Sequence, residues 1–255
     1  MSRTSDILAT RQQRILRAFA SSNTLLAFDY DGTLAPIAPT PALVRMRVRT
    51  RKLLAQVARC YPSIVISGRP LDDIAQRLTG IPVRSVFGNY GGEPSARSKP
   101  PVRVGAWVTH LTERLSTHAG LVVEDKRYSV TIHYRHARSK RRALADIYEA
   151  ARTLPGARVL GGVQAVTLLP KEGPHKGVTL QRAQRQLRCD TAIYVGDDDT
   201  DEDAFASAHP DQLLSIRVGP SRTSRARYRL ERQADIDALL RALLILRQGG
   251  SPVQR

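Results

Sequence analysis

The sequence predicts an α/β fold with a parallel sheet, interrupted by an inserted α+β domain. Short apolar runs that end in polar, glycine-containing turns alternate with amphipathic segments along residues 25–87 and again along residues 175–246. Between these regions the pattern changes to helix, two strands, helix and two strands, which is typical of an α+β unit. Stretches rich in proline, glycine and charged residues separate the regions.

The first region begins with a strand, because the apolar residues 25–28 lead directly into Asp29. The segments that follow are predicted as a helix over 41–61, a strand over 63–67, a helix over 72–78 and a strand over 83–87. Acidic residues in the first turn of the helix over 72–78 suit the positive end of its dipole.

The middle region follows a stretch at 93–102 that is typical of a hinge. Its predicted elements are a helix over 104–118, strands over 121–124 and 129–134, a helix over 140–153, and strands over 157–160 and 164–169. A second hinge is expected at 170–174. The predicted organisation is therefore a first core part over 1–99, a cap over 100–172 and a second core part over 173–255. An insert between two hinges is well placed to act as a lid.

The last region returns to the α/β pattern, with a helix over 175–187, a strand over 191–195, a helix over 201–208, a strand over 213–218 and a helix over 236–246. No apolar run reaches the roughly 18 residues of a membrane span, so no membrane partner is expected. Residues 1–17 contain no apolar signal segment. Cys60 and Cys189 are too few for a disulfide framework, and we expect reduced thiols in a cytoplasmic protein.

The composition is strongly basic, with 40 Lys and Arg against 23 Asp and Glu and a net charge of +17. Nucleic-acid binding is one explanation of such a charge. However, the basic clusters contain no interleaved aromatic residues, no RNP-like run and no helix-turn-helix pattern. Nucleic acid is therefore not the expected partner, although the charge can attract small anionic substrates. The sequence gives no indication of the oligomeric state.

The most informative motif is DYDGTL at residues 29–34, directly after the first strand. Asp29 and Asp31 are two positions apart, so both leave the strand end on the same side. Open α/β sheets bind ligands at the carboxyl ends of their strands, and Gly32 permits a sharp turn there. An ordinary turn or a helix cap would also explain a lone Asp-x-Asp pair.

Three further motifs lie at predicted strand ends or helix starts. Ser67, Gly68 and Arg69 follow the second strand, where a hydroxyl and backbone N–H groups could hold phosphoryl oxygens. Lys176 stands at a helix start, where a cation is unfavourable unless an anion lies nearby. Residues 196–202, GDDDTDE, carry acids that would repel one another without a cation. Each motif alone has an ordinary explanation, but together they predict a phosphoryl-transfer site with Mg²⁺.

This order of motifs resembles the haloacid dehalogenase (HAD) superfamily of phosphotransferases, over nearly the whole chain. The resemblance implies a Rossmann-like core with a parallel sheet, and an α+β cap inserted between the second and third motifs. It also implies catalytic roles. Asp29 would be the nucleophile that forms an aspartyl-phosphate, and Asp31 the general acid and base. Ser67 and Lys176 would hold the phosphoryl oxygens.

The same resemblance implies a magnesium site. Mg²⁺ would bind through the Asp29 carboxylate, the Asp31 carbonyl and Asp197. Asp198 and Asp201 would lie in or near the second coordination sphere.

Finer motifs resemble the trehalose-6-phosphate phosphatases of that superfamily. Residues 196–205 are similar to that family's Gly-Asp-Asp-x-Thr-Asp-Glu-x-x-Phe run, residues 123–126 and 131–135 to its cap hairpin, and residues 224–230 to its C-terminal segment. The resemblance implies a sugar-phosphate substrate, with contacts from Gly68, Arg69, Asn89, Glu124, Lys126 and Arg135. Glu124 and Lys126 alternate correctly to share one face of a strand, although a solvated hairpin face would show the same alternation.

Two departures from the family pattern concern substrate recognition. Thr167 stands where the family has a glutamate three residues before a proline, and Glu172 could substitute for it. The chain also has Gly-Asn-Tyr-Gly at residues 88–91 in place of Gly-x-His-Gly. The alternatives are therefore another sugar phosphate, such as sucrose 6-phosphate or a glucosyl- or mannosylglycerate phosphate, and a non-catalytic sugar-phosphate-binding partner of a synthase.

Overall fold

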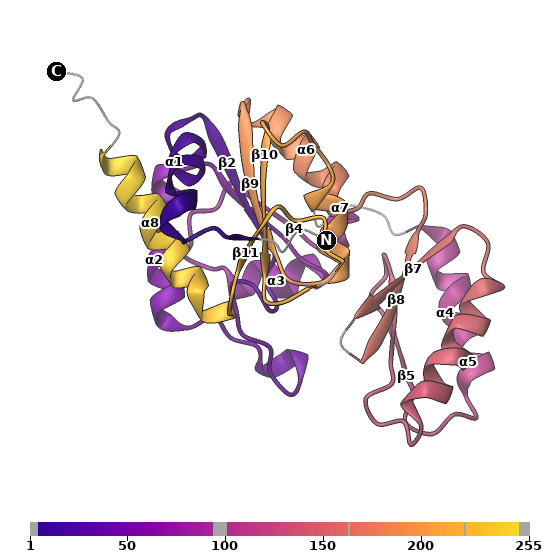
Figure 1. Ribbon diagram of the computed structural model, residues 1–255. Helices are drawn as coiled ribbons and strands as arrows, with labels where there is room; N and C mark the ends of the chain where they lie inside the picture. Colours follow the sequence, from indigo (N-terminus) through magenta and orange to yellow (C-terminus); the bar gives the residue numbers. More distant parts are fainter. Residues whose placement is uncertain (1–4, 94–100, 163, 222, 250–255) are drawn as a thin grey trace.

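Two sheets, each with its own helices, make up the computed structural model, which describes residues 5–93, 101–162, 164–221 and 223–249 (Figure 1). The first is a parallel sheet and the second an antiparallel one, so the predicted α/β core with an α+β insert is confirmed. Most of the predicted hinge over 93–102 lies outside the described residues. The domain boundaries at 100 and 172 stay a prediction.

The core sheet of the described chain contains seven parallel strands in the order β1-β11-β10-β9-β2-β3-β4. Their bounds are β1 Ser5–Asp6, β2 Thr24–Phe28, β3 Ser63–Ile66, β4 Ser85–Phe87, β9 Thr191–Gly196, β10 Leu213–Val218 and β11 Tyr228–Leu230. Strand β2 lies inside the sheet, between β9 and β3, and is buried at every position, as a parallel strand covered on both faces requires.

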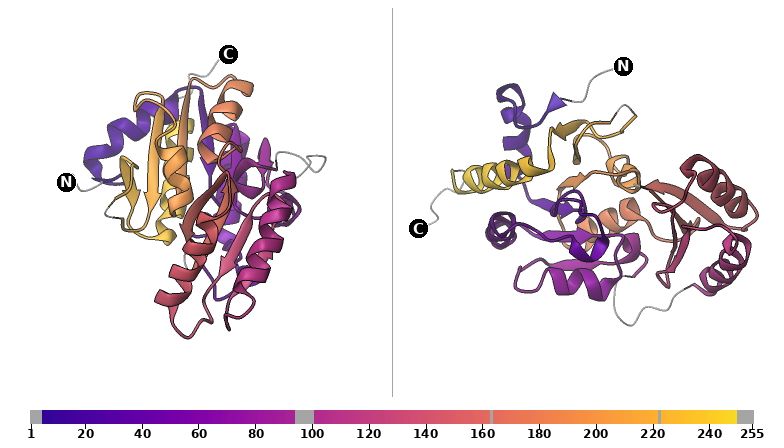
Figure 2. Two further views of the ribbon diagram at one scale, coloured as in Figure 1. Left: turned by 90° about the vertical axis from the view of Figure 1, so that its right-hand side faces the viewer. Right: turned by 90° about the horizontal axis from the view of Figure 1, so that it is seen from below.

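Helices cover both faces of this sheet (Figures 1 and 2). Alternate residues of β2 point to opposite faces: Leu26 and Phe28 join one apolar cluster, Leu25 and Ala27 the other. The first cluster includes residues of α1 Gln13–Ser21, α2 Val48–Cys60, α3 Leu71–Arg77 and α8 Ile236–Gly249. The second includes residues of α6 Lys176–Gln186 and α7 Glu202–Phe205.

The cap sheet is antiparallel, with the order β5-β6-β8-β7 among the described strands. Its elements are α4 Val102–Leu115, β5 Val122–Asp125, β6 Val130–His133, α5 Lys140–Arg152, β7 Ala157–Gly162 and β8 Ala165–Pro170. Val130 and Ile132 of β6 pack with Trp107 of α4 and Ile147 of α5. Both helices lie on the side of the cap sheet away from the core, so its other face is directed toward the core (Figure 1).

Some elements differ from the sequence-based expectation. The strands β1 and β11 and the helix α1 were not predicted, because they are short or lie among arginines. The helix expected over 41–61 is split into the 3-10 turn η2 Pro41–Leu43 and α2. The carbonyl of Pro41 accepts from the N–H of Val44 in this turn and also from Arg69, and the carbonyl of Val44 accepts from Arg77.

The helix expected over 201–208 is likewise shorter, and consists of the 3-10 turn η4 Asp199–Asp201 followed by α7. Cys60 and Cys189 are free thiols. None of the described helices is both long enough and apolar enough to cross a membrane.

Candidate active site

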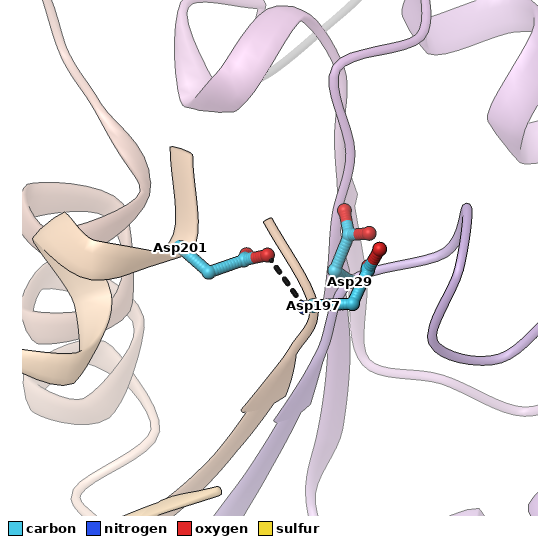
Figure 3. Close-up of side chains that lie close together, drawn as sticks. All are labelled: Asp29, Asp197 and Asp201. Atoms are coloured by element: carbon cyan, nitrogen blue, oxygen red, sulfur yellow. Dashed lines mark hydrogen bonds between the residues drawn. The ribbon is translucent and has the colours of Figure 1, made fainter. Parts of the chain in front are cut away.

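The candidate site lies at the carboxyl ends of β2 and β9, which are neighbours in the core sheet. Asp29 follows β2 and Asp197 follows β9, and the Asp29 N–H donates to the carbonyl of Val195. One carboxylate oxygen from each of Asp29, Asp197 and Asp201 lies within 4.8 Å of the other two (Figure 3). The pairing of the two strands therefore brings together acids from the first and the last predicted motif.

Lys176, the first residue of α6, is the buried cation of this site. Its Nζ donates to Asp29 Oδ1 at 2.8 Å and to Asp201 Oδ1 at 2.7 Å. The side chain is only 2% exposed. Burial by itself lowers the pKa of Lys176, but the charges of Asp201 and Asp29 outweigh it and raise that pKa well above its usual value. The anions expected beside this helix start are therefore the carboxylates of the site.

Asp201 holds the loop after β9 in place. Its Oδ1 accepts from Lys176 and from the Tyr194 hydroxyl at 2.6 Å. Its Oδ2 accepts from the N–H groups of Asp197 and Asp198 at 2.9 and 3.0 Å. A Cβ on Gly196 would lie 2.2 Å from Asp201 Cγ, so this close approach requires glycine. Both oxygens of the Asp201 carboxylate thus accept hydrogen bonds from protein groups, and its role around a metal stays a prediction.

Two residues of the first motif, Gly32 and Thr33, lie directly beside the Asp197 carboxylate. Thr33 Oγ1 donates to Asp197 Oδ1 at 3.0 Å. Gly32 has φ +81°, and a Cβ there would lie 2.0 Å from Asp197 Oδ2. Both the left-handed backbone and the lack of space therefore demand glycine at this turn.

The donor set of the site fits Mg²⁺. Burial raises the pKa of Asp29 well above its usual value; Lys176 opposes this shift, and the neighbouring acids Asp201 and Asp197 add to it. Burial and the charges of Asp201 and Asp198 likewise raise the pKa of Asp197. A divalent cation that prefers oxygen ligands would offset this crowding of carboxylates. The Asp198 Oδ1 already accepts from the N–H and the hydroxyl of Thr200, at 2.8 and 2.6 Å.

Asp31 is held by an arginine. Arg69 Nε donates to Asp31 Oδ2 at 2.7 Å, and Arg69 Nη2 donates to Asp31 Oδ1 at 2.5 Å, which makes a bidentate pair. The same guanidinium donates to Asp73 Oδ2 at 2.7 Å and to the carbonyl of Pro41 at 2.8 Å. Most of its N–H groups are therefore engaged with protein acceptors, and direct contact of Arg69 with a substrate stays a prediction.

Ser67 and Gly68 lie between β3 and Arg69. Ser67 is buried, and its Oγ accepts from the Arg69 N–H at 3.2 Å. A Cβ on Gly68 would lie 2.6 Å from the ring of Tyr90. Tyr90 itself has φ +61°, which is uncommon for a bulky residue. Its ring stands 5.9 Å from Lys176 Nζ, so the loop after β4 also borders the site.

A cavity of about 470 Å³ joins the core and the cap at this point. Several of the predicted site residues line it. The core contributes Asp29, Asp31, Gly68, Arg69, Lys176 and Asp198, and the cap contributes Glu124 and Lys126. His133 of the cap and Tyr90 of the core also line it, and sequence analysis did not select either as a site residue. His133 lies within the cap hairpin motif, but its position beside Glu124 depends on strand register.

The cap side of the cavity carries a small charged cluster. His133 Nε2 lies 2.7 Å from Glu124 Oε2, and Lys126 Nζ lies 3.7 Å from the same oxygen. Burial alone would raise the pKa of Glu124, but the hydrogen bond with His133 and the charge of Lys126 outweigh it and lower that pKa. Glu124 is therefore held as a carboxylate.

Three residues implied or discussed as substrate contacts have other partners, and none of them is among the described residues that line the cavity. Asn89 donates to Glu93 Oε2 at 2.8 Å and accepts from the Ser129 hydroxyl at 3.2 Å. Arg135 of the cap donates to the carbonyl of Pro39 in the core. Thr167 pairs with the Thr131 hydroxyl at 3.0 Å. These contacts link core to cap or strand to strand, and the substrate roles of Asn89 and Arg135 stay predictions.

Comparison with known proteins gives the family. A family model described as trehalose-phosphatase matches residues 27–234. The chain belongs to the trehalose-phosphatase family. A trehalose-phosphate phosphatase of Mycobacterium ulcerans is 34% identical over 201 residues, which are 72% of this chain and 51% of that protein. One of Mycobacterium tuberculosis is 31% identical over 234 residues, 82% of this chain and 59% of that protein. The chain thus spans a little over half the length of these relatives.

Solved structures agree on the fold of this family member. The C-terminal domain of Candida albicans trehalose-6-phosphate phosphatase has a TM-score of 0.79 at 20% identity, with 95% of this chain and 99% of that chain covered. A HAD-superfamily phosphatase of Bacteroides thetaiotaomicron has a TM-score of 0.64 at 13% identity, with 91% and 97% covered. The C-terminal domain of a Candida albicans trehalose synthase regulatory protein has a TM-score of 0.67 at 12% identity, with 91% and 97% covered. The Rossmann-like HAD core with a cap is therefore confirmed.

Proposed function

We propose that this chain is a Mg²⁺-dependent phosphatase that hydrolyses trehalose 6-phosphate to trehalose and phosphate. Membership of the trehalose-phosphatase family supports the reaction. The observation that carries the proposal is the buried pair of Asp29 and Lys176, which borders a cavity shared with Glu124 and Lys126 of the cap. This cavity offers a nucleophile at one end and sugar-binding groups at the other.

In the first step, the Asp29 carboxylate attacks the phosphorus atom and an aspartyl-phosphate forms. Lys176 donates to Oδ1, whereas no described residue donates to Oδ2, so Oδ2 is the oxygen available for attack. The bond between phosphorus and the sugar oxygen breaks, and its electron pair stays on that oxygen. Asp31, protonated once one of its oxygens has left Arg69, gives the sugar oxygen its proton.

In the second step, water attacks the phosphorus of the aspartyl-phosphate. Asp31, now a carboxylate, takes a proton from that water, and the bond between phosphorus and Asp29 breaks to release inorganic phosphate. Lys176 and the hydroxyl of Ser67 hold the phosphoryl oxygens in both steps.

Asp29, Asp197 and the carbonyl of Asp31 are the groups proposed to hold Mg²⁺, with Asp198 and Asp201 around them. When bound, the ion supplies positive charge that stabilises the phosphoryl oxygens. The crowding that raises the pKa values of Asp29 and Asp197 supports a cation at this place.

The cap, proposed to span residues 100–172, recognises the sugar. Glu124 and Lys126 supply an acceptor and a donor for hydroxyl groups on the side of the cavity opposite Asp29. Arg135 is proposed to join them after it leaves the carbonyl of Pro39. Recognition by the cap leaves the phosphoryl chemistry to the core.

Phosphate release from a panel of sugar phosphates with Mg²⁺, beside the Asp29→Asn variant, tests the proposal. We expect release from trehalose 6-phosphate and none above background from the variant, with its fold intact by circular dichroism. Appreciable turnover by Asp29→Asn would remove Asp29 as the nucleophile. A folded wild-type protein that released phosphate from no member of the panel would instead favour a binding or regulatory role.

A second candidate is the same reaction on another sugar phosphate, such as sucrose 6-phosphate or a glucosyl- or mannosylglycerate phosphate. Thr167 favours this alternative, because its hydroxyl pairs with Thr131 where the family has a carboxylate. The panel separates the two, since preferential release from a sugar other than trehalose would keep the mechanism and change the substrate.

A further inference from the structure

We propose that His133 is a positioning residue for sugar recognition, which holds Glu124 so that one of its oxygens accepts a hydrogen bond from a substrate hydroxyl. This inference rests on the proposed function. It concerns the cap side of the cavity, where the structure brings together Glu124, Lys126 and His133.

The strand register puts these side chains on one face. In the antiparallel pair β5–β6, Glu124 is opposite Thr131 and Val122 is opposite His133. Glu124 and His133 are therefore diagonal neighbours, close enough for long side chains to meet. Ile132, between Thr131 and His133, packs among the cap helices on the other face. The core-facing side of the cap hairpin is thus the side that carries the carboxylate and the imidazole.

The two oxygens of the Glu124 carboxylate differ in their partners. His133 Nε2 lies 2.7 Å from Oε2, and Lys126 Nζ lies 3.7 Å from that same oxygen. Among the described residues, none donates a hydrogen bond to Oε1. A carboxylate fixed through one oxygen keeps the acceptor sites of the other for a ligand. The side chains of Glu124 and His133 are 41% and 33% exposed, so both are accessible from the cavity.

This arrangement selects a polyol with neighbouring hydroxyls at the cap end of the substrate. The carboxylate accepts and the ammonium of Lys126 donates within the same small area, and adjacent sugar hydroxyls need that combination. A second phosphate would meet Glu124 as a like charge. With the phosphate of the substrate at Asp29 and Lys176, the chemistry fits a sugar monophosphate whose ring reaches the cap.

Without His133, Oε2 of Glu124 would lose its hydrogen-bond partner, and Lys126 would be the remaining neighbour of that oxygen. The carboxylate could then close fully on the ammonium, so that both groups would be taken from the sugar. Loss of positioning therefore predicts weaker sugar binding with the chemical step retained, because the groups around Asp29 do not change.

The test measures kcat and KM of His133→Ala, His133→Gln and His136→Ala on trehalose 6-phosphate and on p-nitrophenyl phosphate, which has no sugar. For His133→Ala we expect KM for the sugar phosphate to rise about tenfold, the effect of one hydrogen bond, with kcat and the p-nitrophenyl phosphate rates within about twofold of wild type. His133→Gln, which keeps an amide donor at a similar reach, should recover most of the affinity. His136→Ala, at an exposed histidine in the turn after β6, is the matched control.

Equal losses on both substrates, or no rescue by glutamine, would overturn the role of His133. If His133→Ala does not fold, Glu124→Gln, His133→Phe and the double variant form a cycle that addresses the same coupling, because phenylalanine removes the hydrogen bond while it fills a similar space. Additive effects on KM in that cycle would overturn the proposal, whereas coupling would support it. A wild-type protein inactive on every sugar phosphate would instead show that the proposed function itself is wrong, and the role of His133 with it.

Discussion

Lys176 donates one hydrogen bond to Asp29 and one to Asp201, so a single buried cation joins the end of β2 to the loop after β9. Asp29 lies 147 residues before Lys176 in the sequence, and Asp201 lies 25 residues after it. The ion pairs connect the proposed nucleophile to the carboxylate that holds the loop after β9, which is proposed to bind the metal. Catalysis and local stability are therefore expected to depend on the same lysine.

Lys176→Met should abolish turnover and destabilise the fold, because it leaves Asp29 and Asp201 buried without their cation. Breaking a buried pair in this way costs about 3–5 kcal/mol. Urea unfolding at pH 7 measures the loss, and Lys171→Met, at an exposed lysine nearby, should leave the free energy of unfolding nearly unchanged. Lys176 lowers the pKa of the buried Asp29, so this pKa should be higher still in the variant. The loss in free energy of unfolding should therefore become smaller as the pH falls and Asp29 binds a proton. A loss that does not change with pH would contradict the buried pair.

Gly32→Ala should inactivate the enzyme and cost more stability than Gly219→Ala. Both glycines have positive φ, +81° and +79°, so each alanine pays about 1–2 kcal/mol of left-handed strain. Only at Gly32 would the new Cβ meet a neighbour, at 2.0 Å from Asp197 Oδ2, whereas nothing lies within 4 Å at Gly219. Thermal unfolding and phosphate release measure the two effects. Equal stability losses with activity retained would argue that Asp197 moves aside freely.

Arg69→Lys should reduce kcat/KM on sugar phosphates by about 100-fold or more, since lysine cannot reproduce the bidentate pair that orients Asp31. The reduction on p-nitrophenyl phosphate should be much smaller, because p-nitrophenolate leaves without a proton. The ratio kcat/KM is the correct measure, as it includes only steps up to the aspartyl-phosphate. Arg45→Lys, at an exposed arginine, is the control. Equal losses on both substrates would favour Arg69 as a phosphate ligand.

Chelation with EDTA should stop turnover, and added Mg²⁺ should restore it. Mg²⁺ should also raise the melting temperature of the wild-type protein, since a ligand that binds only the folded state stabilises it. Asp197→Asn should weaken this shift, whereas Asp211→Asn, which removes an exposed acid that does not line the cavity, should not. Turnover that is indifferent to EDTA would contradict the metal site.

The pKa of Glu124 should lie below 4.5 in the folded protein and rise toward that value in His133→Ala. Carbonyl-carbon NMR of the glutamate side chain measures it directly. Because the folded-state pKa is lowered, ionised Glu124 contributes stability above about pH 4.5, and this contribution is lost as the pH falls through the folded value. An unchanged pKa in the variant would remove His133 as the main partner of Glu124.

Local patterns predicted most of the fold. The apolar run before Asp29 is the interior strand β2, and the helix–hairpin alternation of the middle region forms the cap. Of the elements that were missed, β1 and β11 are too short to show a pattern, with two and three residues, and α1 has arginines among its apolar residues. Their burial depends on distant neighbours. The loop over 29–47 was partly predicted as helix because the arginines that bind its carbonyls come from a later part of the chain.

The sequence by itself determined which chemistry the chain carries. Asp29, Asp31, Lys176 and the acids after β9 stand at strand ends and helix starts, and apolar runs that stop at polar residues reveal such positions. Only the tertiary structure decided the partner of each group, such as Arg69 for Asp31, His133 for Glu124, and Lys176 for both Asp29 and Asp201. Those pairings depend on strand order and register, which are set by packing between segments far apart in sequence.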